Sequence, residues 1–358
     1  MLAGGQRRRR GPALVGAGVL LLLVALAGVS IGAVPLPFGE VVGSLLRRIG
    51  VHGGTPLPAT QDAILLEWRV PRVVLAALVG GTLALAGASY QGVFRNALAD
   101  PYLLGAASGA GLGATVVIAW GPTQLGPLGT VPVAAFVGSL TGVGLAYALG
   151  AAASRHGGGG TATLLLAGIA VSSFLTAAQT LVQQTHTDDL RLIYSWILGR
   201  LGAAQWDDVT MALPYVVVSA VVMLLSGRAL DVLAVGDDEA TTLGVRPRRV
   251  RLVVLLAASL GTAAAVAVSG LIGFVGLVVP HVVRRLAGGS YRTVLPVSLV
   301  GGAAFMVAAD LAARTLLAPA ELPIGVVTAF VGAPFFAALL RSGSSSRPAA
   351  GWRSGASA

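Results

Sequence analysis

Few ionisable residues in this sequence lie where they could take part in chemistry, and the clearest cases lie beside apolar segments. Asp310 and Arg314 are four positions apart, so on a helix they share one face and can form an ion pair at the membrane surface. Arg69 and Arg72 flank Pro71 at the start of another apolar segment. Charges are costly beside lipid and are often functional there. Two interpretations of Arg69 and Arg72 stay open, surface anchoring and docking of an acidic partner.

The residue types needed for catalysis or metal binding are scarce. The chain has no cysteine and only four histidines, which excludes disulfides, iron–sulfur clusters and thiolate metal sites. His281 follows Pro280 at the end of an apolar segment, where packing or capping is the simpler interpretation. All 24 basic residues are arginine, and a P-loop needs lysine. No catalytic motif is recognisable, so we expect no catalytic, cofactor or metal site in this chain.

Two further patterns suggest contact surfaces. Gly105, Gly109 and Gly113 recur every four residues and form one helical stripe, which favours close helix packing, with a role along a substrate path as the alternative. The polar stretch from Asp231 to Arg251 is unsuited to lipid. Within it, glycine and proline are placed to end one short helix and begin another. Such an element can dock on a soluble partner, and a solvated connector is the alternative.

The elements that must position these residues are membrane-spanning helices. The composition is 55% apolar and 11% charged, far from the roughly 25% charged residues of soluble domains. Apolar segments of about the 20 residues needed to cross a bilayer occur about ten times. We therefore predict an all-α polytopic membrane protein with a single transmembrane domain at 13–341, a basic N-terminus at 1–12 and a disordered tail at 342–358. The predicted spans are 13–33, 64–92, 101–120, 128–150, 161–183, 208–227, 250–269, 271–286, 294–314 and 322–341.

The arginines indicate the orientation. With the N-terminus in the cytoplasm, most arginines fall in cytoplasmic loops, which agrees with the positive-inside rule and with an even number of spans. This explains the formal net charge of +10 better than nucleic-acid binding does. Arg7 to Arg10 followed by Ala25-Leu26-Ala27 resemble a cleaved signal peptide. The apolar run continues to about Ala33, so we favour a retained span, with both termini cytoplasmic.

Several strings along the chain resemble one family, the permeases of iron-siderophore, haem and cobalamin ABC importers (FecCD-type transmembrane subunits). They follow the family's order over most of the sequence. A departure is Ala97, where the family often has proline. The strings are RVPR at 69–72, LVGGTLALAGASYQGVFRNALADPYLLGAASGAG at 78–111, LLLAGIAVSSF at 164–174, WILGRL at 196–201, EATTLGV at 239–245, SGLIGFVGLVVPHVVRRLAG at 269–288 and AELPIGVVTAFVGAPFFAALL at 320–340.

The resemblance implies ten helices per subunit, pairing with a second permease subunit as a homodimer or heterodimer, and a path at the subunit interface. It implies two cytoplasmic ATPase subunits that use ATP and Mg, so this chain would bind no cofactor itself. It also implies an extracytoplasmic substrate-binding protein that docks through acidic residues on Arg69, Arg72 and Arg314. The coupling helices of the family fall on 229–249. The coupling residues expected there are Glu239, Ala240, Gly244, Arg246 and Arg248.

The expected function is therefore ATP-driven transport of a ferric siderophore or related iron chelate across the bacterial cytoplasmic (inner) membrane. Haem and cobalamin are the alternative substrates. An ATP-independent secondary transporter would need a coupling carboxylate at mid-membrane, and Asp310, the one candidate, lies near the predicted surface. An intramembrane enzyme would need a catalytic serine, paired aspartates or metal-binding histidines within a span, and the sequence shows no such motif.

Overall fold

The computed structural model describes residues 2–32, 34, 36–48, 50–51, 57–121, 129–154 and 161–344. Within these ranges the regular structure is entirely helical, which confirms the predicted all-α fold. The predicted disordered tail lies outside the described residues from position 345 onward.

All ten predicted spans coincide with helices. Seven helical segments in the described part of the chain are long and apolar enough to cross a membrane. They are α1 (Leu2–Ser30), α4 (Val70–Phe94) together with the preceding α3 (Ala59–Ala63) and η1 (Ile64–Arg69), α6 (Thr130–Ser154), α7 (Thr161–Thr185), α9 (Trp206–Leu225), α12 (Pro247–Ser269) and α14 (Tyr291–Thr315). The other three predicted spans correspond to α5 (Ala106–Trp120), α13 (Val275–Ala287) and α15 (Ile324–Ser344).

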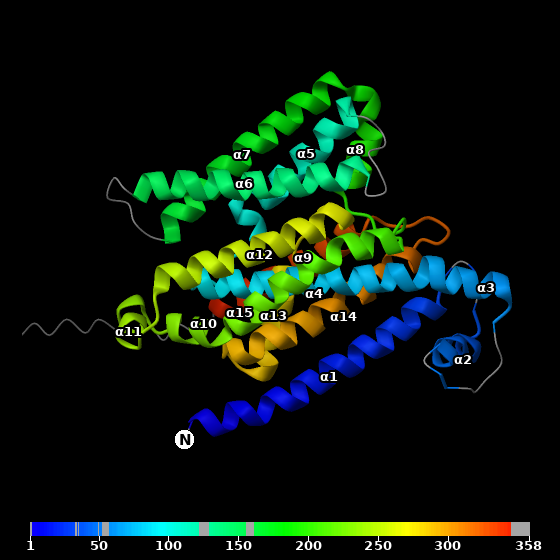
Figure 1. The fold of residues 1–358 in the computed structure, drawn as a ribbon, viewed down its shortest axis with the longest axis horizontal. Coiled ribbons are helices and arrows are strands. Elements are labelled where there is room, and N and C mark those ends of the chain that lie inside the picture. Colours follow the sequence, from blue (N-terminus) through cyan, green and yellow to red (C-terminus); the bar gives the residue numbers. More distant parts are fainter. Residues whose placement is uncertain are drawn as a thin grey trace, which may run out of the picture.

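Shorter elements lie at the two ends of the bundle (Figure 1). The end that carries the N-terminus, called here the N-terminal end, also carries α10 (Gly227–Leu233) and α11 (Asp237–Thr242). The opposite end carries α2 (Phe38–Arg48), α3 and α8 (Leu190–Ile197). Two single turns complete the described elements, η2 (Pro101–Leu104) before α5 and η3 (Thr187–Asp189) before α8.

Helix α4 lies at the centre of the bundle and packs against α14, α12, α13 and α9. Small residues make these contacts close. A Cβ on Gly80 would overlap the Gly302 carbonyl of α14, and a Cβ on Gly87 would overlap the backbone of Gly276 in α13. In lipid, helices associate largely through such packing, because the surrounding chains are as apolar as the side chains.

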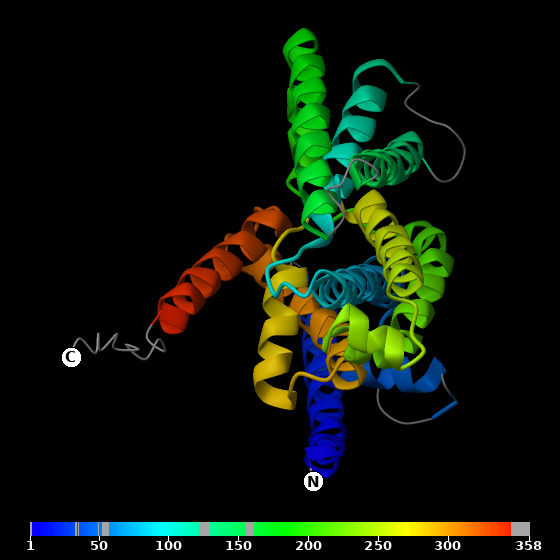
Figure 2. The same ribbon diagram turned by 90° about the vertical axis from the view of Figure 1, so that its left-hand side faces the viewer.

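Helices α5, α6 and α7 form a second group that packs on α12. In Figure 2 this group lies to one side of the α4 bundle, while α15 extends away from α9 and α12. The non-helical stretch 270–274 joins α12 to α13. The Tyr102 hydroxyl accepts from Ile272 N at 3.1 Å and donates to Ile272 O at 3.0 Å. A protein side chain thereby satisfies irregular backbone that lipid could not.

Candidate functional site

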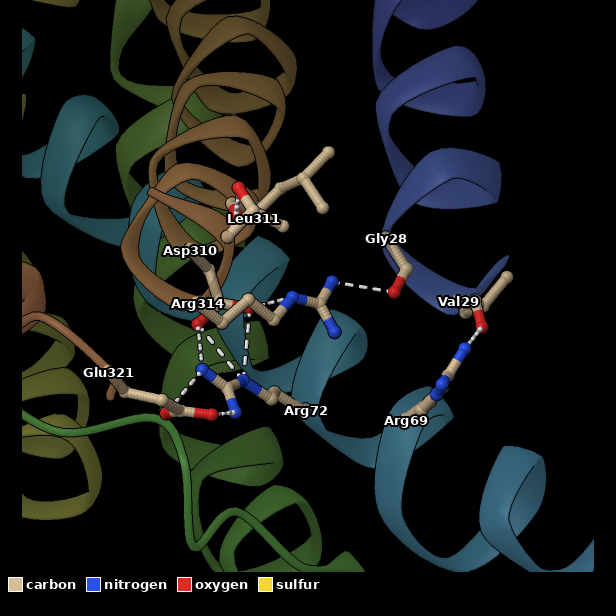
Figure 3. A network of polar contacts seen from close by, with 9 residues as sticks. Gly28, Val29, Arg69, Arg72, Asp310, Leu311, Arg314 and Glu321 are labelled. Carbon is tan, nitrogen blue, oxygen red and sulfur yellow. Dashed lines mark hydrogen bonds and ion pairs between the residues drawn. The ribbon is translucent and has the colours of Figure 1, made fainter. Parts of the chain in front are cut away.

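An ion-pair cluster joins α4 and α14 at the opposite end of the bundle (Figure 3). Arg72 Nε lies 3.0 Å from both carboxylate oxygens of Asp310, and Nη2 lies 2.9 Å from Oδ1. The same guanidinium donates to both oxygens of Glu321, at 2.8 and 3.0 Å. The side chains of Arg72 and Asp310 are 11% and 2% exposed, and that of Glu321 is 46% exposed. Glu321 is therefore the solvent-exposed member of the two ion pairs.

The other two predicted docking arginines hold the end of α1. Arg314 Nη2 donates to Gly28 O at 2.6 Å, and Arg69 Nη1 donates to Val29 O and Ser30 O at 2.9 and 2.7 Å. The last four carbonyls of a helix have no partner within it, and cations near them also interact favourably with the helix dipole. Two arginines from other helices thus satisfy three consecutive carbonyls at the end of α1.

The cluster brings Arg72 and Arg314 to one carboxylate. Arg314 Nε lies 3.7 Å from Asp310 Oδ2, so the ion pair predicted from the four-residue spacing exists, but it is longer than the pair with Arg72. Asp310 is buried rather than placed at a water-exposed surface. Outside the spans, the hydrogen bond from Arg72 holds the pKa of Glu321 below its usual value. Glu321 therefore stays charged at neutral pH.

At the N-terminal end, Asp237 ties α11 to two long helices. Its Oδ1 accepts from Arg251 of α12 at 2.6 Å and also from Arg95, which follows α4. The hydrogen bond from Arg251 contributes most to holding the pKa of Asp237 below its usual value. Arg95 Nε further donates to Leu233 O of α10 at 2.7 Å.

A second aspartate ties α10 to α14. Asp231 Oδ2 accepts from Ser290 Oγ at 2.8 Å, and Oδ1 accepts from Tyr291 N at 2.6 Å. Because Tyr291 begins α14, the carboxylate lies at a helix N-terminus, where negative charge is stabilised. Arg292 Nε lies 3.3 Å from the same carboxylate. The predicted coupling stretch is thus attached to α4, α12 and α14.

Local turn chemistry shapes this element as the sequence predicted. Gly244 has a φ of +79°, its N–H donates to Thr241 O at 3.0 Å, and Val245 N donates to Ala240 O at 2.9 Å. These two bonds are the Schellman pattern that ends a helix at a left-handed glycine. Pro247 then begins α12.

The predicted coupling residues divide into an inward and an outward set. Ala240 is fully buried and packs α11 on the bundle. Glu239, Arg246 and Arg248 are exposed, as is Gly244. Between them lies Leu243, which is 67% exposed.

The glycine stripe of α5 faces α6. A Cβ on Gly109 would overlap the Gly138 carbonyl, and a Cβ on Gly113 would overlap the Ala134 carbonyl. A Cβ on Gly105, which precedes α5, would lie 3.1 Å from the Gly142 carbonyl oxygen, a tight contact without overlap. These contacts are close helix packing, and a role of the stripe along a substrate path stays a prediction.

A cavity of about 440 Å³ lies between α5, α7 and α8. Hydroxyl and amide side chains of α5 and α7 line it together with Tyr102, Tyr194 and apolar residues. The polar lining residues on α5 and α7 are Ser108, Ser172, Thr176, Gln179, Thr180 and Gln183.

Sequence reasoning missed several of these residues. No sequence pattern marked Asp237 or Glu321, because the arginines that pair with them are distant in the sequence or lie on other helices. Gln179 did have one: it belongs to a polar set with helical spacing on α7. His281 was interpreted as a packing or capping residue, and its ring lies 5.9 Å from that of Phe335.

Comparison with known proteins finds relatives that match most of this chain. The chain is 40% identical over 356 residues to the cobalamin import system permease protein of Halobacterium salinarum, covering 91% of this chain and 94% of that protein. It is 41% identical over 325 residues to the hemin transport system permease protein of Yersinia pestis, covering 89% and 92%. A solved structure described as an inward-facing conformation of a metal-chelate type ABC transporter matches with a TM-score of 0.80 and 28% identity, covering 92% of this chain and 98% of that one.

The model of the FecCD transport family matches residues 20–342, which include the residues of the ion-pair cluster, of the predicted coupling stretch and of the cavity. On that match and on these relatives, this multi-pass membrane chain belongs to the FecCD transport family.

Proposed function

We propose that this chain is the transmembrane permease subunit of a binding-protein-dependent ABC importer that moves a ferric siderophore or related iron chelate by ATP-driven alternating access. The observation that carries the proposal is the attachment of α10 and α11 to the bundle by Asp231 and Asp237. An exposed element fastened to several spanning helices is suited to passing movement from a soluble partner into the membrane.

The proposed partner at this surface is a pair of cytoplasmic ATPase subunits, which would use ATP and Mg. Closure of those subunits would push on α11, and the ion pair of Asp237 with Arg251 would pass the displacement to α12. The bonds of Asp231 to the start of α14 would pass it to a second helix. Energy enters by contact alone, so this chain would need no nucleotide site.

The proposed orientation places both termini and α11 in the cytoplasm of a bacterium, with the ion-pair cluster on the outer side of the inner membrane. An extracytoplasmic binding protein would then dock near Arg72 and Glu321. Because the arginines already have partners within the chain, an acidic docking residue would have to share or displace Glu321, the exposed member.

A second permease subunit, identical or related, would cover apolar surface that the single chain leaves open. Phe330 of α15 is 77% exposed, and Phe174 and Leu181 of α7 are 71% and 67% exposed. Lipid would cover the remainder.

Haem or cobalamin transport is the second candidate, because relatives named for both substrates match most of this chain. An ATP-independent transporter has less support. The carboxylate that it would need, that of Asp310, is paired with Arg72 near the end of α14.

Copurification and uptake test the proposal. The tagged chain would be expressed with its candidate ATPase, purified and reconstituted, and ATP-driven uptake of a ferric siderophore delivered by the binding protein would be measured. Leu243→Glu places a charge at the exposed docking surface without touching a buried contact. We expect this variant to lose the ATPase and the uptake while its thermal midpoint stays unchanged.

The control is Asp188→Asn, an exposed residue before α8 at the other end of the bundle. This variant should keep both the ATPase and the uptake. Recovery of the intact chain without any ATPase, or uptake that continues without ATP, would overturn the proposal.

A further inference from the structure

Helix α2 carries an apolar edge that the rest of the chain does not cover. Phe38, Val42 and Leu46 follow one another at intervals of four residues, so they lie along one side of the helix. Phe38 is 56% exposed and Leu46 is 36% exposed, while Val42 is half-buried. We call these three residues the apolar edge of α2.

A different side of α2 makes the contacts with the protein. Val41 and Ser44 are buried. Ser44 Oγ donates to Asp62 Oδ1 of α3, and Arg48 Nη2 donates to Asp62 Oδ2 at 3.1 Å. These contacts fix how α2 is turned about its own axis. The apolar edge therefore points away from the protein because of the packing, and it does not result from a loosely held helix.

The side opposite the apolar edge is polar. Glu40 and Arg47 are seven positions apart, which places them on one side of a helix, and both are partly exposed. A helix with an exposed apolar edge and a charged side opposite to it is typical of segments that lie in the surface of a membrane.

The position of α2 fits such a surface. Figure 1 shows α2 beside the end of α1, almost end-on, whereas the spanning helices run across the picture. Three exposed tryptophans lie at this end of the bundle: Trp68 before α4, Trp120 at the end of α5 and Trp206 at the start of α9. Tryptophan is enriched where lipid meets water. Asp62, which holds α2, precedes Trp68 by only six residues.

The apolar edge also continues a surface that faces lipid. The spanning part of α1 is only 17% buried by the chain, and Ile31 and Val34, between α1 and α2, are exposed. Helix α2 contacts α1. In Figure 2, α1 lies at the bottom, whereas α7 lies at the top and α15 at the left. A second permease subunit on α7 and α15 would therefore leave this side of the bundle to lipid.

We propose that α2 is an interfacial helix whose partner is the lipid of the leaflet at this end of the bundle. Its apolar edge lies among the acyl chains just below the headgroups, and Glu40 and Arg47 face water. Apolar faces of such helices enter the membrane by about 5–10 Å. The inference depends on the membrane-spanning fold alone, so it goes beyond the proposed transport function and does not rest on it.

The contacts of Asp62 give this anchor a consequence for the rest of the chain. Helix α3 continues through η1 into α4, and this segment carries Arg69 and Arg72. By holding α3 at the membrane surface, α2 sets the depth at which the two arginines lie.

The absence of cysteine from the chain allows a direct test. Phe38→Cys and Leu46→Cys place a spin label on the apolar edge, and Glu40→Cys places a matched label on the opposite side. Each full-length chain is reconstituted in vesicles of phosphatidylethanolamine and phosphatidylglycerol. Electron paramagnetic resonance then measures collisions of the label with oxygen, which dissolves in lipid, and with a water-soluble nickel chelate.

We expect the ratio of oxygen to nickel collisions to be several-fold higher at both edge positions than at Glu40→Cys. An equally low ratio at all three positions would place the edge in water and overturn the proposal. Few collisions with either reagent at the edge positions would show that protein covers them, which overturns it as well.

A second measurement tests anchoring without a label. The double variant Phe38→Ser with Leu46→Ser removes the apolar edge and leaves the contacts of Ser44 and Asp62 in place. Hydrogen exchange of a peptide covering 38–48 should become several-fold faster in the same vesicles, with no change in peptides from α12. Unchanged exchange of the 38–48 peptide would show that lipid does not hold α2.

Discussion

Arg72 is held by Asp310 through both carboxylate oxygens, each 3.0 Å from Nε, although the two residues are 238 positions apart in the chain. This pair fastens α4 to α14 at the end of the bundle where α1 also terminates (Figure 3). Arg314 approaches the same carboxylate from α14 itself. One buried aspartate thus lies beside two arginines, and Glu321 supplies the second negative charge of the cluster.

Asp310→Asn should destabilise the protein strongly. The substitution leaves Arg72 and Arg314 buried with less compensation, and removal of one partner of a buried pair costs about 3–5 kcal/mol. Glu321→Gln is the matched control, since its side chain is 46% exposed and exposed pairs contribute about 0–1 kcal/mol. Thermal unfolding in detergent should show a large decrease for the first variant only. Equal shifts would contradict the central role of Asp310.

Arg69→Met should loosen the end of α1. The change removes the donors to Val29 O and Ser30 O, which then lack partners away from bulk water. Hydrogen exchange of a peptide covering 26–32 should become faster, with little change in peptides from α12. Trp68→Phe, at an exposed neighbouring position, should leave exchange unaltered. Unchanged exchange in Arg69→Met would show that the cap does not hold the helix end.

The attachment of α11 to the bundle should weaken only at acidic pH. The pKa of Asp237 is lowered in the folded protein, so its stabilising effect is present above the unfolded value of about 3.9. That effect is lost as pH falls through the lower folded pKa. A spin label at Thr242→Cys should keep constant mobility from pH 8 to about 5 and become mobile below about pH 4. Adding Asp237→Asn should make the label mobile at every pH. A loss of order near neutral pH would contradict this assignment.

Gly109→Ala should weaken the packing of α5 on α6. The added methyl group would overlap the Gly138 carbonyl, and overpacking of this kind costs about 1–3 kcal/mol. Gly144→Ala on α6 is the control, because its added Cβ meets nothing within 4 Å. Alanine is there the better helix former by roughly 0.5–1 kcal/mol. The two variants should shift the thermal midpoint in opposite directions, and a shared direction would contradict the packing role.

The sequence by itself determined the elements whose cause is local. Apolar segments of spanning length predicted every long helix, because transfer from water to lipid depends on the composition of each segment. Gly244 and Pro247 predicted where α11 ends and α12 begins, because left-handed backbone and a missing N–H are properties of single residues. The spacing of Asp310 and Arg314 likewise predicted their ion pair.

Only the tertiary structure decided which distant groups meet. Arg72 became the closer partner of Asp310, and Arg69 became a cap for α1. The helical spacing of the polar residues on α7 was readable in the sequence, but the cavity beside them was not. The Gln179 amide lies against α5 because Gly111 has no side chain there. Which helices pack together depends on where small residues let two backbones approach closely. A local sequence pattern does not show which helix the partner is.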